Sequence, residues 1–176
     1  DAGTGTTSVG VIGTGTEIGT LSIGSVENGG ITLNGAITTD GVITIDGPIT
    51  LATTAITITT ADDNINLQGT VDGGKALTLA SGSGAVTVDG AIGGSTALTS
   101  LTVNSSGAGT IEITNIGTSS AAGVTGATAI GNANTGTLTL DGTVYTTNAA
   151  TYTAATGENI DLTGGSTTTF TSSNDN

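Results

Sequence analysis

Residue types on which many enzymes and compact cores depend are missing from this chain. Its 176 residues include no Cys, His, Met or Trp, one Pro, and three aromatic residues, Tyr145, Tyr152 and Phe170. Without His or Cys, the Ser–His and Cys–His nucleophile systems are excluded. Two carboxylates alone can hydrolyse a glycoside, but sugars are usually held on aromatic platforms, and the three aromatics lie only in the last third of the chain. We therefore expect that the protein is not an enzyme.

Basic residues are almost absent as well. Lys75 is the only Lys or Arg against 14 Asp and Glu, which gives a formal net charge of −13. Nucleic-acid binding needs cations to neutralise phosphates, so we exclude a nucleic-acid partner. An anionic membrane surface would repel the chain, and no stretch approaches the ~20 apolar residues of a membrane helix. We therefore expect no membrane insertion.

What the chain does contain is a recurring phrase of apolar–polar–apolar residues, a polar residue with Gly, and a second apolar residue. One copy runs from Ile43 to Ile49 and reads ITIDGPI, and others begin at Ile31, Ile65, Val86 and Leu138. Alternation in steps of two indicates strands with Ile, Val and Leu facing inward and Thr facing outward. Asp-Gly and Asn-Gly permit positive φ and a sharp corner. Each phrase therefore predicts a short strand, a corner and a second short strand.

The spacing of the phrases indicates how the strands are arranged. Comparable strands begin at residues 43, 65, 86, 111, 138 and 160, at intervals of 22, 21, 25, 27 and 22. A period of this size with two or three short strands is typical of a β-solenoid. We predict an all-β, right-handed parallel β-solenoid (β-helix) with about 22 residues per coil and about eight coils. A β-sandwich is the alternative fold, because short strands separated by frequent turns also suit it.

The regularity of the phrase also suggests a division of the chain. Residues 1–20 are rich in Gly and Thr and form either an N-terminal segment or a first coil. Residues 21–176 form the β-solenoid, with an irregular excursion at about 117–136.

Acidic residues supply the candidate metal ligands. Asp62, Asp63 and Asn64 place three oxygen donors in a row before a strand, and Asp72 follows about half a coil later. Carboxylates and carbonyls suit calcium, so these four residues form a candidate calcium site, although a solvated loop explains them better, and no other cofactor is indicated. The acids Asp46, Asp89 and Asp141, with Asn34 and Gln68 as polar substitutes, recur at one place in the phrase. They could bind calcium too, but capping of their own corners by side-chain hydrogen bonds explains them better.

The Thr residues offer a further possible binding surface. We predict one outward ladder of Thr32, Thr44, Thr57, Thr78, Thr87, Thr102 and Thr139. A flat Thr array can order water and bind ice, whereas the simpler explanation is that Thr is a good solvent-facing strand residue. The aligned Asn66, Glu112 and Asp161 interrupt the ladder. The alternative function is thus a binding module for calcium, glycan or ice that uses the Thr/Asp-rich outer face.

Two long runs resemble a known class of proteins. Residues 62–79 and 84–103 are similar to repeats of giant bacterial surface proteins of the filamentous-haemagglutinin-like and autotransporter-like type. The resemblance covers residues 21–116 and, more loosely, 138–165. It implies an extracellular right-handed β-helix at the bacterial cell surface that serves adhesion, with a possible glycan or host-surface partner, or builds filaments. It carries over no functional residues.

These observations lead to one expected function. We expect a structural rod or filament-forming module whose open ends pair strand to strand, with copies of itself or further repeats of the same polypeptide. Neither terminus shows a polar amphipathic cap that would close an end.

Overall fold

The computed structural model describes residues 5–24 and 29–172, and within them it consists of strands joined by turns, with no helix. Neighbouring strands of the 18-stranded sheet are parallel in every named pairing. The strands are β1 (Thr7–Val9), β2 (Leu21–Gly24), β3 (Ile31–Leu33), β4 (Ile37–Thr39), β5 (Ile43–Asp46), β6 (Ile49–Leu51), β7 (Ala55–Thr60), β8 (Ile65–Leu67), β9 (Val71–Asp72), β10 (Ala76–Ala80), β11 (Val86–Ile92), β12 (Ser100–Asn104), β13 (Ile111–Ile116), β14 (Val124–Ile130), β15 (Leu138–Leu140), β16 (Val144–Tyr152), β17 (Ile160–Leu162) and β18 (Thr169–Ser172).

The strands stack into three faces that run along the molecule. Face A contains β2, β5, β8, the first halves of β11 and β13, β15 and β17. Face B contains β1, β3, β6, β9, the second halves of β11 and β13, the start of β16, and β18. Face C contains β4, β7, β10, β12, β14 and the rest of β16. The chain visits the faces in the order B, C, A.

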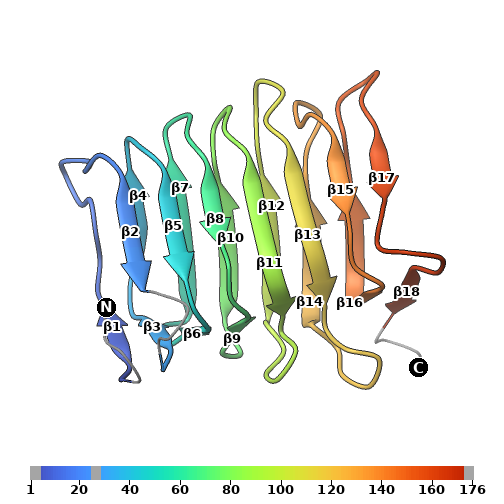
Figure 1. Ribbon diagram of the computed structural model, residues 1–176, viewed down its shortest axis with the longest axis horizontal. Coiled ribbons are helices and arrows are strands. Elements are labelled where there is room, and N and C mark those ends of the chain that lie inside the picture. Colours follow the sequence, from blue (N-terminus) through green and yellow to red (C-terminus); the bar gives the residue numbers. More distant parts are fainter. Residues whose placement is uncertain (1–4, 25–28, 173–176) are drawn as a thin grey trace.

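The path of the chain is a right-handed coil. In Figure 1 the chain advances from the N-terminus on the left to the C-terminus on the right, descending along face A in front and ascending along face C behind. The predicted parallel β-solenoid is therefore confirmed, and a β-sandwich, which is built from antiparallel sheets, is not the fold.

The predicted coil length is also confirmed. On face A the register joins Ile43, Ile65, Val86, Ile111, Leu138 and Ile160, the residues that begin the phrases. Face A has seven strands, starting with β2, instead of eight coils. The difference arises because the intervals of 25 and 27 residues lengthen the turns without adding a strand.

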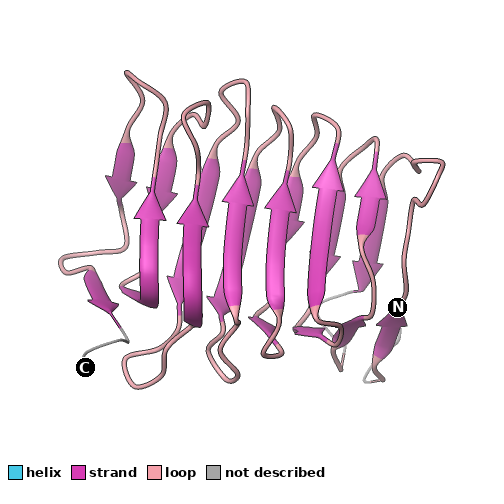
Figure 2. Ribbon diagram, turned by 180° about the vertical axis from the view of Figure 1, so that it is seen from behind, coloured by secondary structure: helices cyan, strands magenta, loops and turns pink. Residues whose placement is uncertain are grey.

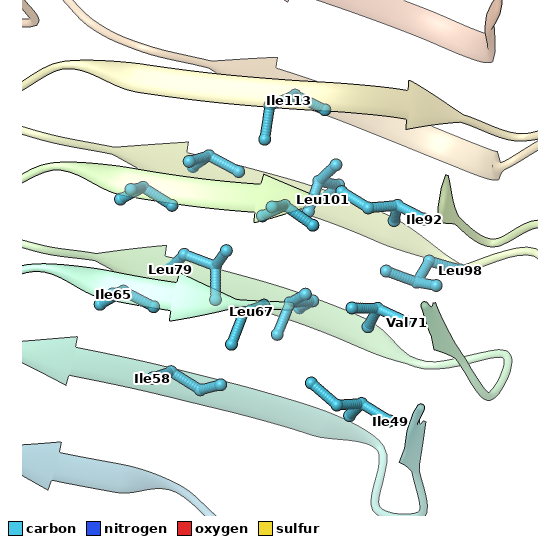
Figure 3. Packing of buried hydrophobic residues seen from close by; sticks show 14 of the residues in the cluster. Ile49, Ile58, Ile65, Leu67, Val71, Leu79, Ile92, Leu98, Leu101 and Ile113 are labelled. Carbon is cyan, nitrogen blue, oxygen red and sulfur yellow. The ribbon is translucent and has the colours of Figure 1, made fainter. Parts of the chain in front are cut away.

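The core is a set of aliphatic stacks between the faces. Figure 3 shows Ile and Leu side chains, such as Ile65 and Leu79, projecting from strands of opposite faces into the same interior. One stack runs along face A from Ile43 through Ile65 and Val86 to Leu138, and each of these side chains is fully buried. Burial of this apolar surface is the main favourable contribution to folding.

Aromatic residues replace the aliphatic ones in the last coils. Tyr145 continues the stack of Ile92 and Ile116 on face B, and its ring lies 5.2 Å from that of Phe170 in a stacked arrangement. The Tyr145 hydroxyl donates to the carbonyls of Ile113 (2.8 Å) or Thr114 (2.9 Å) and accepts from a backbone N–H. Burial raises the pKa of Tyr145 to about 12.

At the corner between faces A and B, Gly47 has the predicted positive φ of 133°, but the other glycines are needed for a different reason. Gly69, Gly90 and Gly142 do not have positive φ. A Cβ on Gly90 would lie 2.3 Å from the carbonyl carbon and oxygen of Gly69, and one on Gly69 would lie 2.1 Å from the Gly47 oxygen. These glycines are required because successive corners stack backbone on backbone, which leaves no room for a side chain.

Two parts of the domain division can be placed in the structure. Within the described residues 5–20, β1 pairs with β3, and Ile12 and Ile18 form bridges to face C, so this segment forms a first coil. The expected excursion at 117–136 is wrong for its centre, because residues 124–130 form β14, which pairs with β12 and β16. Only the flanking turns leave the coil. The sequence VTGATAI hides this strand because Gly126 and Thr128 interrupt the run of large apolar residues between the buried Val124 and Ile130.

Candidate functional site

The four predicted calcium ligands do not come together. Asp62, Asp63 and Asn64 lie in the turn between β7 and β8, whereas Asp72 lies on β9, at the opposite edge of the coil in Figure 1. In the part of the chain that the structure describes, no group of three or more Asp, Glu, His or Cys residues could hold a metal ion. The four residues therefore do not form one site.

These side chains instead join one coil to the next. The Asp62 carboxylate accepts a hydrogen bond from Ser83 N (3.0 Å), and the Asn64 side-chain oxygen accepts one from Ala85 N (2.9 Å). The hydrogen bond from the Ser83 backbone holds the pKa of Asp62 below its usual value. Such bonds satisfy backbone donors that the corner would otherwise leave unpaired.

Asp72 makes the same kind of connection on face B. Its carboxylate oxygen accepts from the backbone N–H groups of Ser95 and Thr96, each at 2.8 Å. The Asn115 side-chain oxygen likewise accepts from two backbone N–H groups, those of Thr143 and Val144 in the coil that follows Asn115. Asp62, Asn64 and Asp72 therefore each bond to the backbone of the following coil.

Local capping is done by buried hydroxyl groups that the sequence argument missed. Thr39, Thr60, Ser81 and Ser105 occupy aligned positions where the chain leaves face C toward face A in successive coils, and all four are buried. The hydroxyl of Ser81 donates to Gly84 O (2.7 Å), and that of Ser105 donates to Gly109 O (2.6 Å). The only sequence signal was a Thr or Ser two residues after the last apolar inward residue in these four coils.

The recurring corner acids are separated along the solenoid. The residue after the second inward residue of face A is, in successive coils, Asp46, Gln68, Asp89, Thr114, Asp141 and Thr163. Acids therefore alternate with neutral residues and lie about 9.6 Å apart, two strand spacings. Asn34 does not belong to this row, because it follows β3 at the corner between faces B and C. The wide spacing favours a structural role over a continuous ladder of calcium ligands.

The predicted Thr ladder is divided among the three faces. Thr32 lies on face B, Thr44, Thr87 and Thr139 lie on face A, and Thr57, Thr78 and Thr102 lie on face C. Only the three on face C are Thr neighbours in consecutive coils. The prediction of one ladder is therefore wrong, because the phrases that contain these residues fall on different faces.

A pocket of about 320 Å³ lies on the outside of face B. Its floor is formed by outward residues of β16 and β18, and its wall is the loop of residues 118–122. Gly117 N donates to Ile92 O (2.8 Å) and Gly123 N donates to Thr146 O (2.9 Å), which fixes both ends of this loop. Six lining residues carry hydroxyls and none is charged: Thr118, Ser119, Ser120, Thr146, Thr169 and Thr171, with Ala121, Ala122 and Val144.

Comparison with known proteins adds no relative. No protein-family model, no curated protein and no solved structure matches this chain. The described residues also contain no helix long and apolar enough to cross a membrane.

Proposed function

We propose that the protein is a structural module, a stiff rod at an extracellular bacterial surface whose ends stack on further coils. The further coils belong to another copy or to the same polypeptide. The rod-like fold and the resemblance of residues 62–79 and 84–103 to surface-protein repeats support this role.

One observation carries the proposal. The inward residues of the last coil, Ile160, Leu162 and Phe170, are 45%, 53% and 48% exposed. The residues directly before them in the same stacks, Leu138, Leu140 and Tyr145, are at most 1% exposed. Large apolar side chains that occupy core positions but contact solvent are typical of an interaction surface.

The backbone supports the same conclusion. Among the described residues, β17 and β18 each pair on one side only, as do β1 and β2 at the other end, where Val11 and Ile18 are 62% and 38% exposed. An unpaired edge offers a row of N–H and C=O groups to an incoming strand. Stacking would satisfy these groups and cover the apolar residues together.

The test is the length of the particles in solution. Seven strand spacings give about 34 Å for one chain, so stacked copies should appear in negative-stain images as longer rods. Leu162→Asp puts a charge into the stack and should leave single short particles. Thr163→Asp adds the same charge on the outside of the corner and should behave as the wild type. Discrete wild-type monomers at high concentration would contradict stacking between copies, and equal behaviour of the two variants would contradict stacking at this end.

The pocket on face B favours a second candidate function, recognition of a neutral glycan. Hydroxyl groups both donate and accept hydrogen bonds, as sugar hydroxyls require, and Val144 and the two Ala residues offer an apolar patch for a sugar ring. In the described part of the chain, the hydroxyls of Ser119, Thr169 and Thr171 have no protein partner.

Calorimetry with neutral and acidic oligosaccharides tests this second function. Thr171→Val keeps the side-chain shape but removes a hydroxyl, and it should weaken binding of a neutral sugar about tenfold, the effect of one lost hydrogen bond. Thr139→Val on face A is the matched control. Absence of binding, or equal losses in both variants, would refute the function.

A further inference from the structure

Face C has an outer surface unlike that of the other two faces. Its strands lie side by side toward the viewer in Figure 2. Because inward and outward residues alternate, the register gives three outward rows of small side chains. They are Ala55, Ala76, Ser100, Ala127 and Ala149; Thr57, Thr78, Thr102, Ala129 and Thr151; and Thr38, Thr59, Ala80 and Asn104.

None of the face C strands contains a charged residue, although the chain has a net charge of −13. Face A carries Glu112 and Asp161 on its outside, and face B carries Asp72. The remaining acids of the described strands, Asp46 and Asp89, lie at the corner between faces A and B. Two copies that met through face A or face B would therefore bring like charges together.

The number of outward Ala residues is a second, independent difference between face C and face A. The corresponding outward row on face A is Ser22, Thr44, Asn66, Thr87, Glu112, Thr139 and Asp161, without a single Ala. Ala is depleted in strands and gains little where the outer side faces water. Six Ala residues on one face are better explained by a neighbouring sheet, because small side chains allow two sheets to approach closely.

We propose that face C is a lateral interface to a second copy of this chain, packed face to face. A twofold arrangement places the same neutral surface on both partners, so the contact complements itself. Six strands of five residues cover about 475 Å² on each copy, from strand spacings of about 4.8 Å and a rise of about 3.3 Å per residue. About 950 Å² in total lies below the standard size of a stable interface. A single pair therefore dissociates readily, and longer rods bind more tightly because contacts add along their length. This contact does not require the stacking of ends.

The absence of cysteine makes a direct test possible. A single Thr102→Cys lies in the middle of face C, and a single Thr87→Cys lies on the outside of face A as the matched control. With a short bismaleimide at equal protein concentration, we expect dimers from Thr102→Cys to form at least about tenfold faster. Added salt should increase the yield, because it screens the repulsion between the acidic chains. Equal rates for the two variants would overturn the proposal.

Two additional variants separate this contact from other associations. Ala80→Asp, combined with Thr102→Cys, puts a charge on face C and should remove the excess of dimer, whereas Thr139→Asp on face A should not. Leu162→Asp blocks the end of the solenoid and should leave the crosslinking unchanged. If Leu162→Asp abolished the crosslinking, the dimers would come from end stacking and face C would not be the interface.

Discussion

Replacing Gly90 by Ala tests whether the corner glycines are required by the stacking of coils. The new Cβ would lie 2.3 Å from the carbonyl carbon and oxygen of Gly69 and 2.5 Å from the nitrogen of Thr70. All three contacts are with backbone, so no side chain can rotate away. Relief requires the two coils to separate by about 1 Å, since ordinary carbon contacts begin near 3.5 Å.

The size of the effect follows from what this separation disrupts. Overpacking in a rigid site costs about 1–3 kcal/mol, and one stretched hydrogen bond between coils adds about 1 kcal/mol. We therefore expect Gly90→Ala to lower the free energy of unfolding by about 3 kcal/mol. Gly19→Ala is the matched control, because a Cβ there meets nothing within 4 Å and its φ is not positive. Its effect should lie within about 0.5 kcal/mol of zero.

Urea unfolding, followed by far-UV circular dichroism, measures this difference. Trypsin gives a second readout, because Lys75 is its only cleavage site and the Lys75 carbonyl accepts a hydrogen bond from Thr99 N (3.0 Å). Cleavage at Lys75 then reports opening of the neighbouring coils. If Gly90→Ala and Gly19→Ala were equally stable, the explanation by close stacking would be refuted.

Four other predictions concern hydroxyl and carboxyl groups. Tyr145→Phe should lower the free energy of unfolding by about 1–3 kcal/mol because it leaves buried partners unsatisfied, while Tyr152→Phe, whose hydroxyl has no partner, should be neutral or stabilising. Burial raises the pKa of both tyrosines to about 12, so the unfolded chain ionises first and thermal melts should show stability falling between about pH 10 and 12. Asp62 has a lowered pKa, so its contribution to the stability of the folded chain is present above about pH 4 and is lost as the pH falls through the pKa of the folded state. When the pH is lowered, Asp62→Ala should therefore lose less stability than the wild type. Thr114→Asp would place three acids in successive coils and should destabilise by about 1–2 kcal/mol at low salt, with recovery in 1 M salt and no effect of Thr114→Asn.

The sequence predicts those parts of the fold that depend on side-chain size alone. On face A the inward residues are all Ile, Val or Leu, so the period and the positions of the strands could be read directly. Strand β14 was not predicted because Gly126 and Thr128 interrupt the alternation of apolar and polar residues. Thr128 occupies an inward position where the two preceding coils have Leu. The position of Tyr145 in the core was also not predicted. A tyrosine at the second position of a strand does not indicate in sequence that its hydroxyl will bond to the backbone of the preceding coil.

The candidate site could be predicted less well, since its chemistry acts between coils. Asp62 and Asn64 look like metal ligands in sequence because they are adjacent, yet each oxygen bonds to a backbone N–H 21 residues later. A local pattern cannot show which residue lies directly above in the next coil. That neighbour depends on the length of the intervening coil, which varies from 21 to 27 residues on face A.

The placement of charge unites these observations. In a solenoid each outward residue lies about 4.8 Å from its counterpart in the next coil, so a repeated acid would place like charges in contact along the whole rod. The corner row avoids this by alternating acidic and neutral residues, which separates charges by about one Debye length at physiological salt. Face C goes further and carries no charge on its strands. In the face-to-face packing that we propose, the acids on faces A and B disfavour lateral contact there, and the neutral face C is left as the lateral interface. The same distribution of charge would keep like charges apart in the coil stack and direct how copies pack side by side.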